Sequence, residues 1–386
     1  MMWSALFRPV PEGAMALIRH VRRLKRRVRQ ARFFVGVLKT PYRPILAHLI
    51  PTRRCNLACT YCNEFDDHSA PVPAADLFRR IDCLAGLGTG IVTLSGGEPL
   101  LHPDADAIIS HIRAHGMIAT LITNGYLLTE DRIRRLNRAG LDHLQISIDN
   151  VLPDAVSKKS LKVLDRKLQW LAAIAEFDVT VNSVVGGGTL QSDDAVTIAR
   201  RARSLGFSTT AGIIHDTRGE LRSLDDTQRR ILDGLIELGG STFDLATYNR
   251  FQKNLANGRP NEWHCGAGAR YLYVCEDGLV HWCSQQRGYP GIPLEQYGVA
   301  DLEREYRQVK SCAPYCTVGC VHRVAQLDEL RVNPQAVLSQ WFPSTPDNRT
   351  HRPLSIRVLT WAFVDSPHRR FFRDTAARLF GARRST

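Results

Sequence analysis

The sequence predicts an α/β fold with a parallel sheet, followed by a smaller cysteine-rich region. Short apolar runs recur six times before residue 215, and amphipathic helical patterns separate them. Six of the ten cysteines then lie between residues 265 and 320. With 386 residues, 44% of them hydrophobic, the chain is long enough for one barrel-sized domain and a smaller one.

The expected strands are short, apolar and rich in β-branched residues. They are Ile45 to Ile50, Ile91 to Leu94, Ile118 to Ile122, Leu144 to Ile148, Val179 to Val185 and Thr209 to Ile214. Helical periodicity predicts helices at Asp76 to Leu87, Asp104 to His115 and, after the last strand, Asp225 to Leu238. In parallel barrels the carboxyl ends of the strands carry the ligand-binding loops, so polar residues at these ends are candidate site residues.

The first strand is followed by three closely spaced cysteines, Cys55, Cys59 and Cys62. Three thiolates can hold three irons of a four-iron, four-sulfur cluster and leave the fourth iron open to a small molecule. Structural zinc is the alternative, but zinc sites usually add a second Cys or His pair. Between Cys62 and Cys83 the chain offers only His68, so the spacing favours iron and sulfur.

Further motifs follow the next strands in order: Gly96-Gly97-Glu98-Pro99, then Thr123-Asn124-Gly125, then Ser147-Ile148-Asp149. Together with the three cysteines and Tyr61 before the last of them, these motifs resemble the radical S-adenosylmethionine (SAM) superfamily. The resemblance implies a partial, open (β/α)6 barrel that binds a 4Fe-4S cluster and SAM.

The resemblance also implies roles for the strand-end residues. Gly96 and Gly97 would let backbone groups approach the amino group of SAM, although a tight turn alone also favours glycine. Pro99 would shape that turn, and Glu98 would accept hydrogen bonds that fix the loop. Polar contacts to the carboxylate and ribose of SAM would come from Thr123, Asn124, Ser147, Asp149 and Asn182, which could equally be turn formers. Tyr61 would border the adenine, or supply only packing.

The implied activity is that of a radical SAM oxidoreductase. An electron, supplied from outside by a flavodoxin or ferredoxin, would cleave SAM reductively to a 5′-deoxyadenosyl radical that abstracts hydrogen from a peptide or small-metabolite substrate. Cys55, Cys59 and Cys62 carry that chemistry. Two alternatives stay open: a radical SAM enzyme that modifies a membrane lipid, and a non-enzymatic iron-sulfur or zinc module.

A second group of five cysteines resembles the auxiliary iron-sulfur domains called SPASM and twitch. These ligand candidates are Cys265, Cys283, Cys312, Cys316 and Cys320. Five candidates are too few for the two clusters of a full SPASM domain, which predicts one auxiliary 4Fe-4S cluster; zinc is an alternative. The spacing leaves open which four of the five are ligands. Cys275 and Cys83 lie in strand and helix patterns and read as small core residues.

The net charge of +13 is concentrated at the two ends of the chain. Residues 1–54 carry +12 and residues 349–386 carry +7, which leaves −6 for the body. This distribution argues against a nucleic-acid groove through the catalytic site, because phosphate binding needs basic residues along the site. Both basic ends also carry apolar residues, so contact with an anionic membrane is one hypothesis and docking on the barrel is the other.

The same patterns define the expected organisation. We expect a basic amphipathic extension at 1–44, the barrel at 45–218, a helical bridge at 219–258, the auxiliary domain at 259–330 and a basic extension at 331–386. The first apolar stretch is interrupted by Arg8, and no run reaches the roughly 18 apolar residues of a span. The cysteines occur in ligand-like clusters, so the expected location is cytoplasmic, and the membrane hypothesis adds peripheral contact at the inner membrane face.

Overall fold

The computed structural model describes residue 33 and residues 41–186, 193–214, 221, 223–238, 251–333 and 336–337. Within these ranges nine strands form one sheet in the order β6-β5-β4-β3-β2-β1-β7-β8-β9. The strands are β1 (Leu46–Thr52), β2 (Ile91–Gly96), β3 (Ile118–Thr123), β4 (His143–Ser147), β5 (Asp178–Gly186), β6 (Ser208–Ile214), β7 (Tyr271–Val274), β8 (Leu279–His281) and β9 (Pro290–Pro293). The basic extensions expected at the two ends lie outside the described residues, apart from a few positions next to the body.

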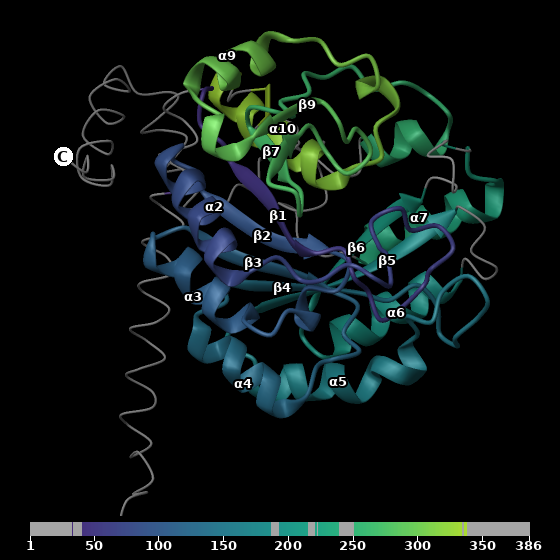
Figure 1. Ribbon diagram of the computed structural model, residues 1–386. Coiled ribbons are helices and arrows are strands. Elements are labelled where there is room, and N and C mark those ends of the chain that lie inside the picture. The colour runs from purple at the N-terminus through teal and green to yellow at the C-terminus, as the bar shows by residue number, and fades with distance from the viewer. Residues whose placement is uncertain are drawn as a thin grey trace, which may run out of the picture.

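The six expected barrel strands are confirmed, and their bounds differ from the expected ones by at most two residues. Helices alternate with them and cover the outer side of the curved sheet (Figure 1). The helices that follow these strands are α2 (Ala74–Gly86), α3 (Ala105–Ala114), α4 (Glu130–Ala139), α5 (Leu161–Ile174), α6 (Asp194–Ser204) and α7 (Asp226–Leu238), of which α7 lies in the segment 219–258 expected as a helical bridge. The fold is therefore an open, partial (β/α)6 barrel, as the sequence predicts.

Helix α4 shows how local sequence sets these elements. Thr129 precedes it in an extended conformation and accepts a hydrogen bond from the backbone N–H of Arg132 at 3.1 Å. Glu130 and Asp131 lie in its first turn, where negative charge stabilises a helix. Gly140 ends it in the left-handed region at φ 83°, which glycine adopts without a steric cost.

The two faces of the barrel sheet carry different chemistry, because side chains alternate along each strand. Facing the helices, a row of fully buried apolar side chains runs in register across the strands: Leu49, Leu94, Leu121 and Leu144. One position earlier on each strand, the inward row is polar: His48, Thr93, Thr120 and His143. The alternation thus buries a core on one side and builds a polar interior on the other.

The auxiliary region continues the barrel sheet, which the sequence did not predict. Strand β7 pairs in parallel with the free edge of β1, and β8 and β9 follow as antiparallel neighbours. The auxiliary region is completed by two helices, α9 (Val299–Arg307) and α10 (Gly319–Val332), and two short 3-10 helices, η2 (Leu294–Gln296) and η3 (Ala313–Tyr315). A third 3-10 helix, η1 (Pro99–Leu101), follows β2 in the barrel. Strand β1 is therefore central, with the barrel on one edge and the auxiliary region on the other.

A buried charge pair ties the auxiliary region to the barrel. The side chain of Arg270 is 0% exposed; its Nε lies 2.9 Å from Asp328 on α10, and it donates to the carbonyl of Arg43 at 2.6 Å. Asp328 also accepts a hydrogen bond from Tyr306 at 2.7 Å and pairs with Arg331 at 3.2 Å. One carboxylate thus holds α10 against the strand that extends the sheet.

We predict that Asp328→Ala lowers the free energy of unfolding by about 3 to 5 kcal/mol, because it leaves Arg270 charged and buried without its carboxylate. Denaturant unfolding followed by circular dichroism measures this. Asp233→Ala is the control, since its contact with Lys253 is exposed and should contribute about 1 kcal/mol or less. Equal losses in the two variants would contradict the prediction.

Candidate functional site

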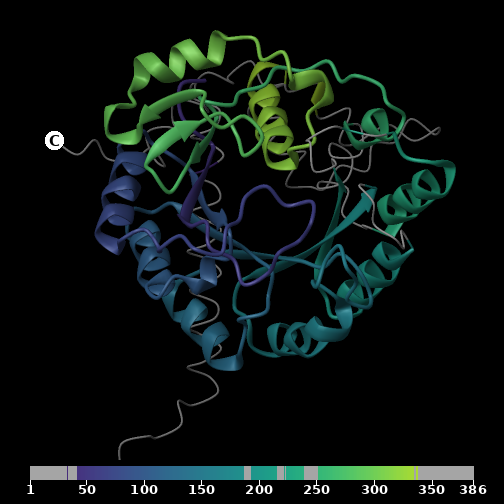
Figure 2. The ribbon, with the colours of Figure 1, turned by 45° about the vertical axis from the view of Figure 1, so that its right-hand side comes forward.

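The three clustered cysteines lie on the loop that follows β1, inside the ring of helices. Figure 2 shows this loop, in purple, crossing the open centre of the barrel. Cys59 is buried, and Cys55 and Cys62 are half-buried. All three line one cavity of about 260 Å³, together with residues at the ends of β2, β3 and β4. The parallel register brings these strand ends together, as the sequence predicts.

The predicted site residues divide into those that line this cavity and those that lie behind it. The lining members are Cys55, Cys59, Cys62, Gly96, Gly97, Thr123, Asn124 and Ser147. Not among the lining residues are Tyr61, Glu98, Pro99, Asp149 and Asn182. Their geometry indicates supporting contacts, and the cofactor contacts expected of all these residues stay predictions.

Glu98 lies behind the lining residues and holds the edge of the cavity in place through hydrogen bonds. Its carboxylate is 0% exposed and accepts hydrogen bonds from the Thr123 hydroxyl at 2.8 Å and the backbone N–H groups of Asn124 at 2.8 Å and Leu100 at 3.0 Å. Burial raises the pKa of this carboxyl above its usual value, while the hydrogen bonds act in the opposite direction. Glu98 therefore fixes the ends of β2 and β3 relative to each other rather than facing a ligand.

The two glycines of the motif are required by the packing of the protein itself. A Cβ on Gly97 would lie 2.3 Å from the carbonyl oxygens of Arg53 and Arg54, just before Cys55. Gly96 has φ +110°, and a Cβ there would lie 2.9 Å from the carbonyl oxygen of Thr52. Both glycines also line the cavity, but the close approach of the cysteine loop is sufficient to require them.

Asp149, Tyr61 and Lys159 form a buried polar group beside the cavity. Tyr61 donates to Asp149 Oδ2 at 2.5 Å, and Lys159 pairs with that carboxylate at 3.0 Å and contacts the Tyr61 hydroxyl. Burial alone would lower the pKa of Lys159, but Asp149 and then Tyr61 and Cys59 raise it well above its usual value, so the ammonium stays charged. Asp149 Oδ1 is buried without a hydrogen-bond partner among the described residues. Asp149 thus keeps one acceptor available.

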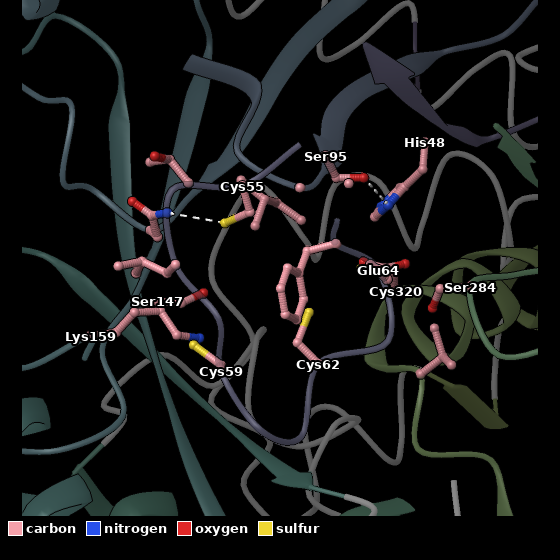
Figure 3. A pocket seen from close by; sticks show the side chains of 18 of the residues that line it. His48, Cys55, Cys59, Cys62, Glu64, Ser95, Ser147, Lys159, Ser284 and Cys320 are labelled. Atoms are coloured by element: carbon pink, nitrogen blue, oxygen red, sulfur yellow. Dashed lines mark hydrogen bonds between the residues drawn. The ribbon is translucent and has the colours of Figure 1, made fainter. Parts of the chain in front are cut away.

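Sequence reasoning missed Lys159 and a second wall of the cavity. That wall consists of His48 on β1, Glu64, Tyr271 on β7, Ser284 and Cys320 on α10. In Figure 3, His48, Glu64, Ser284 and Cys320 lie across the cavity from Cys55, Ser147 and Lys159. Of these residues, Cys320 was one of the five expected ligand candidates of the auxiliary cluster, and the structure places it on this cavity. The alternation along β1 could have indicated His48, and no local motif marks the others.

The cysteine thiols of the cavity suit the binding of a metal cation better than they suit reaction as free thiolates. Burial, and then the carboxylate of Glu98, raises the pKa of Cys55, and burial and Glu64 raise that of Cys62 to about 11. Hydrogen bonding by the backbone of Leu57 and Glu64 acts in the opposite direction and lowers the pKa of Cys55 and Cys62, respectively. The three thiols would release their protons on binding a metal cation, and thiolates are soft ligands that suit an iron-sulfur cluster. The unpartnered oxygen of Asp149, in the polar group beside the cavity, suits a polar small molecule there.

In the auxiliary region the structure brings together four of the five candidate thiols. Burial is the main cause that raises the pKa of Cys265, Cys283 and Cys316. A further cause is the negative charge of neighbouring thiolates, and it acts within every pair among these three cysteines and Cys312. The Cys316 sulfur also accepts a hydrogen bond from the backbone N–H of Val318 at 3.4 Å. Cys320 instead lines the first cavity.

Comparison with known proteins agrees with this arrangement. The radical SAM superfamily profile matches residues 49–222. PqqA peptide cyclase from Methylorubrum extorquens (strain PA1) is 30% identical over 280 residues, which span 67% of this chain and 70% of that protein. This chain belongs to the radical SAM superfamily. It is a radical SAM enzyme and uses a 4Fe-4S cluster and SAM, so the non-enzymatic alternative is wrong.

Solved structures agree with the radical SAM fold. The crystal structure of Streptococcus suis SuiB superposes with a TM-score of 0.51 at 14% identity, covering 68% of this chain and 66% of that one. SuiB bound to S-adenosylmethionine superposes with a TM-score of 0.50 at 14% identity, over 73% and 74% of the two chains. No helix among the described residues is long and apolar enough to cross a membrane.

We predict that Gly97→Ala removes about four irons per chain, one cluster, because its Cβ displaces the backbone that carries Cys55. Iron and protein analysis after anaerobic reconstitution measures the loss. Gly86→Ala is the matched control, since a Cβ at Gly86 meets nothing within 4 Å. Full iron content in Gly97→Ala would show that the cysteine loop tolerates the added methyl group.

His48 makes stability depend on pH. Burial lowers its pKa from 6.5 to about 4, so protonation favours the unfolded chain, and the stability present above pH 6.5 is lost as the pH falls toward 4. We expect wild type to lose about 1 kcal/mol more than His48→Gln between pH 7.5 and pH 5.5. Denaturant unfolding at both pH values tests this; His322, whose pKa is also lowered to about 4, contributes equally to both proteins. Parallel pH profiles would refute the assignment.

Proposed function

We propose that this chain is a radical SAM oxidoreductase that abstracts a hydrogen atom from a peptide. The observation that carries the proposal is the single cavity that runs from the three thiols of the β1 loop to the wall formed by β7 and the auxiliary region. Such a cavity offers a place for SAM at the strand ends and a place for a second molecule against the auxiliary region. A cofactor site alone would not need the second wall.

The proposed roles follow from the contacts. Cys55, Cys59 and Cys62 would hold three irons of the cluster, and the bound cofactors supply the electron transfer and carbon–sulfur cleavage that yield a 5′-deoxyadenosyl radical. Asn124 lies with its amide nitrogen 3.7 Å from Cys55 Sγ, and Ser157 Oγ lies 3.5 Å from Cys59 Sγ. Hydrogen bonds of this kind to cluster sulfurs tune the reduction potential.

Other residues of the site would position SAM without touching the reacting bond. Thr123, Asn124 and Ser147 present polar atoms at three neighbouring points of the rim, where the carboxylate and ribose of SAM are expected. Asp149 is held by Lys159 and Tyr61 through one oxygen and offers the other. Glu98 holds the ends of β2 and β3 in register.

The auxiliary region, which we place at residues 259–330 beside a barrel at 45–218, would hold one auxiliary 4Fe-4S cluster. The mutual proximity of four thiols supports one cluster rather than two. Zinc suits the same four ligands, so metal analysis decides between the two. An electron donor of the flavodoxin or ferredoxin class would reduce the first cluster.

A peptide is the substrate class that the relatives support. PqqA peptide cyclase is named for a peptide substrate, and it shares most of its length with this chain. A small metabolite is the less specific alternative. Modification of a membrane lipid, and peripheral membrane contact in the cytoplasm, depended on the basic ends, which lie outside the described residues.

We expect the reconstituted, dithionite-reduced enzyme to convert SAM to 5′-deoxyadenosine, and Cys59→Ala to lose this activity to background. Cys83→Ala is the control, since Cys83 lies on the outer helix α2. Chromatography with mass detection measures the product. Cleavage by Cys59→Ala at the wild-type rate would refute the site, and zinc in place of iron would refute the chemistry.

The substrate class is tested by the rate of the same reaction with added fractions of a cell extract. A peptide fraction should raise the rate of 5′-deoxyadenosine formation and lose that effect after protease treatment. Lipid vesicles and the small-metabolite fraction are the comparison arms. Stimulation only by vesicles or only by the protease-resistant fraction would overturn the peptide assignment while leaving the radical SAM activity intact.

A further inference from the structure

The second wall of the cavity contains two groups that the chemistry described so far does not use, Cys320 and His48. Both line the cavity, from α10 and β1 respectively, and in Figure 3 both lie across it from Cys55. We propose that Cys320 is a free thiol of the substrate subsite and not a ligand of the auxiliary cluster.

The local backbone distinguishes Cys320 from the neighbouring ligand candidate Cys316. At Cys316 the backbone N–H of Val318, two residues further on, donates to the sulfur at 3.4 Å. That arrangement needs a loop, because the N–H must turn back toward the side chain. Cys320 is the second residue of α10, and the chain after it continues as helix. The N–H of His322, two residues after Cys320, donates to the carbonyl of Val318 at 3.3 Å, so Cys320 lacks the contact that Cys316 receives.

The surroundings of Cys320 also differ from those of the four clustered thiols. Cys265, Cys283, Cys312 and Cys316 already form a complete set of four ligands, and a cluster with four thiolates has no vacant iron for a fifth. Tyr271, on the adjoining β7, is 1% exposed, lines the cavity and lies near Cys320, Cys283 and Cys316.

His48 indicates independently that this wall receives a ligand. It is 7% exposed, its Nδ1 lies 2.9 Å from the Ser95 hydroxyl, and its Nε2 has no hydrogen-bond partner among the described residues. A buried ring nitrogen without a partner costs free energy unless a bound molecule or water satisfies it. Because His48 and Cys320 line the same cavity, a polar group of the substrate can contact both.

This inference rests on the proposed function for the identity of the ligand, which would be a polar group of a peptide side chain or backbone. Glu64 and Ser284 complete the wall, and the Glu64 carboxylate is already engaged by Tyr273 at 2.8 Å. The subsite thus combines one imidazole nitrogen, one thiol, one hydroxyl and the Glu64 carboxylate, a set suited to hydrogen bonding with a polar group of a peptide.

Iron content tests the ligand half of the proposal without any need for activity. In a chain that carries Cys55→Ala, Cys59→Ala and Cys62→Ala, only the auxiliary cluster can form. Adding Cys320→Ala should retain about four irons per chain, whereas adding Cys316→Ala should lose them. Cys275→Ala, a buried cysteine outside the group, is the control for general damage. Loss of iron in Cys320→Ala to the level of Cys316→Ala would overturn the proposal.

Alkylation tests the cavity-facing half on the intact, cluster-loaded wild type. Anaerobic treatment with iodoacetamide, then trypsin and mass spectrometry, examines residues 311–323, which contain Cys312, Cys316 and Cys320 in one peptide. We expect carbamidomethyl on Cys320 and little on Cys312 or Cys316, since metal-bound thiolates are shielded. Unmodified Cys320, or equal labelling of all three, would overturn the assignment of a free, accessible thiol. Neither measurement depends on SAM cleavage. Failure of this inference can therefore be distinguished from failure of the proposed function.

Discussion

The pairing of strand β1 on both of its edges is the constraint on which the rest of the structure depends. On one edge it is in parallel register with β2, and on the other with β7, more than two hundred residues later in the chain. The cysteine loop leaves the end of this strand and so lies between the barrel and the auxiliary region. The described residues that line the cavity therefore come from β1 and its loop, from the ends and following loops of the next barrel strands, or from the wall built on β7.

Buried polar contacts keep this junction in place. Arg270 and Asp328 join β7 to α10 without exposure to water, and Arg80 on α2 donates to the carbonyl oxygens of Cys275 and Glu276 at the end of β7. Glu98 performs the equivalent task inside the barrel by joining the ends of β2 and β3. Buried charges are tolerated here because each is paired or hydrogen-bonded, and each therefore specifies one geometry.

The polar interior explains how one fold serves both cofactor and substrate. The inward row that begins with His48 is the same alternation that buries Leu49 against the helices. At the strand ends the row opens into the cavity, where thiols and amides meet on one side and the imidazole of His48 and the thiol of Cys320 on the other. The similarity to PqqA peptide cyclase is consistent with a peptide as the second molecule, and a peptide is long enough to reach this wall.

The sequence by itself determined the six barrel strands, their order and the residues at their ends, because strand alternation, helical periodicity and cysteine spacing are local properties of a chain. It also marked Glu98 as a residue that fixes the loop. Only the tertiary structure decided that β7 joins β1, that Lys159 pairs with Asp149 and that His48 faces the cavity. It also separated Cys320 from the other four thiols, since Cys312, Cys316 and Cys320 are equally spaced along the chain and differ only in where the backbone turns them.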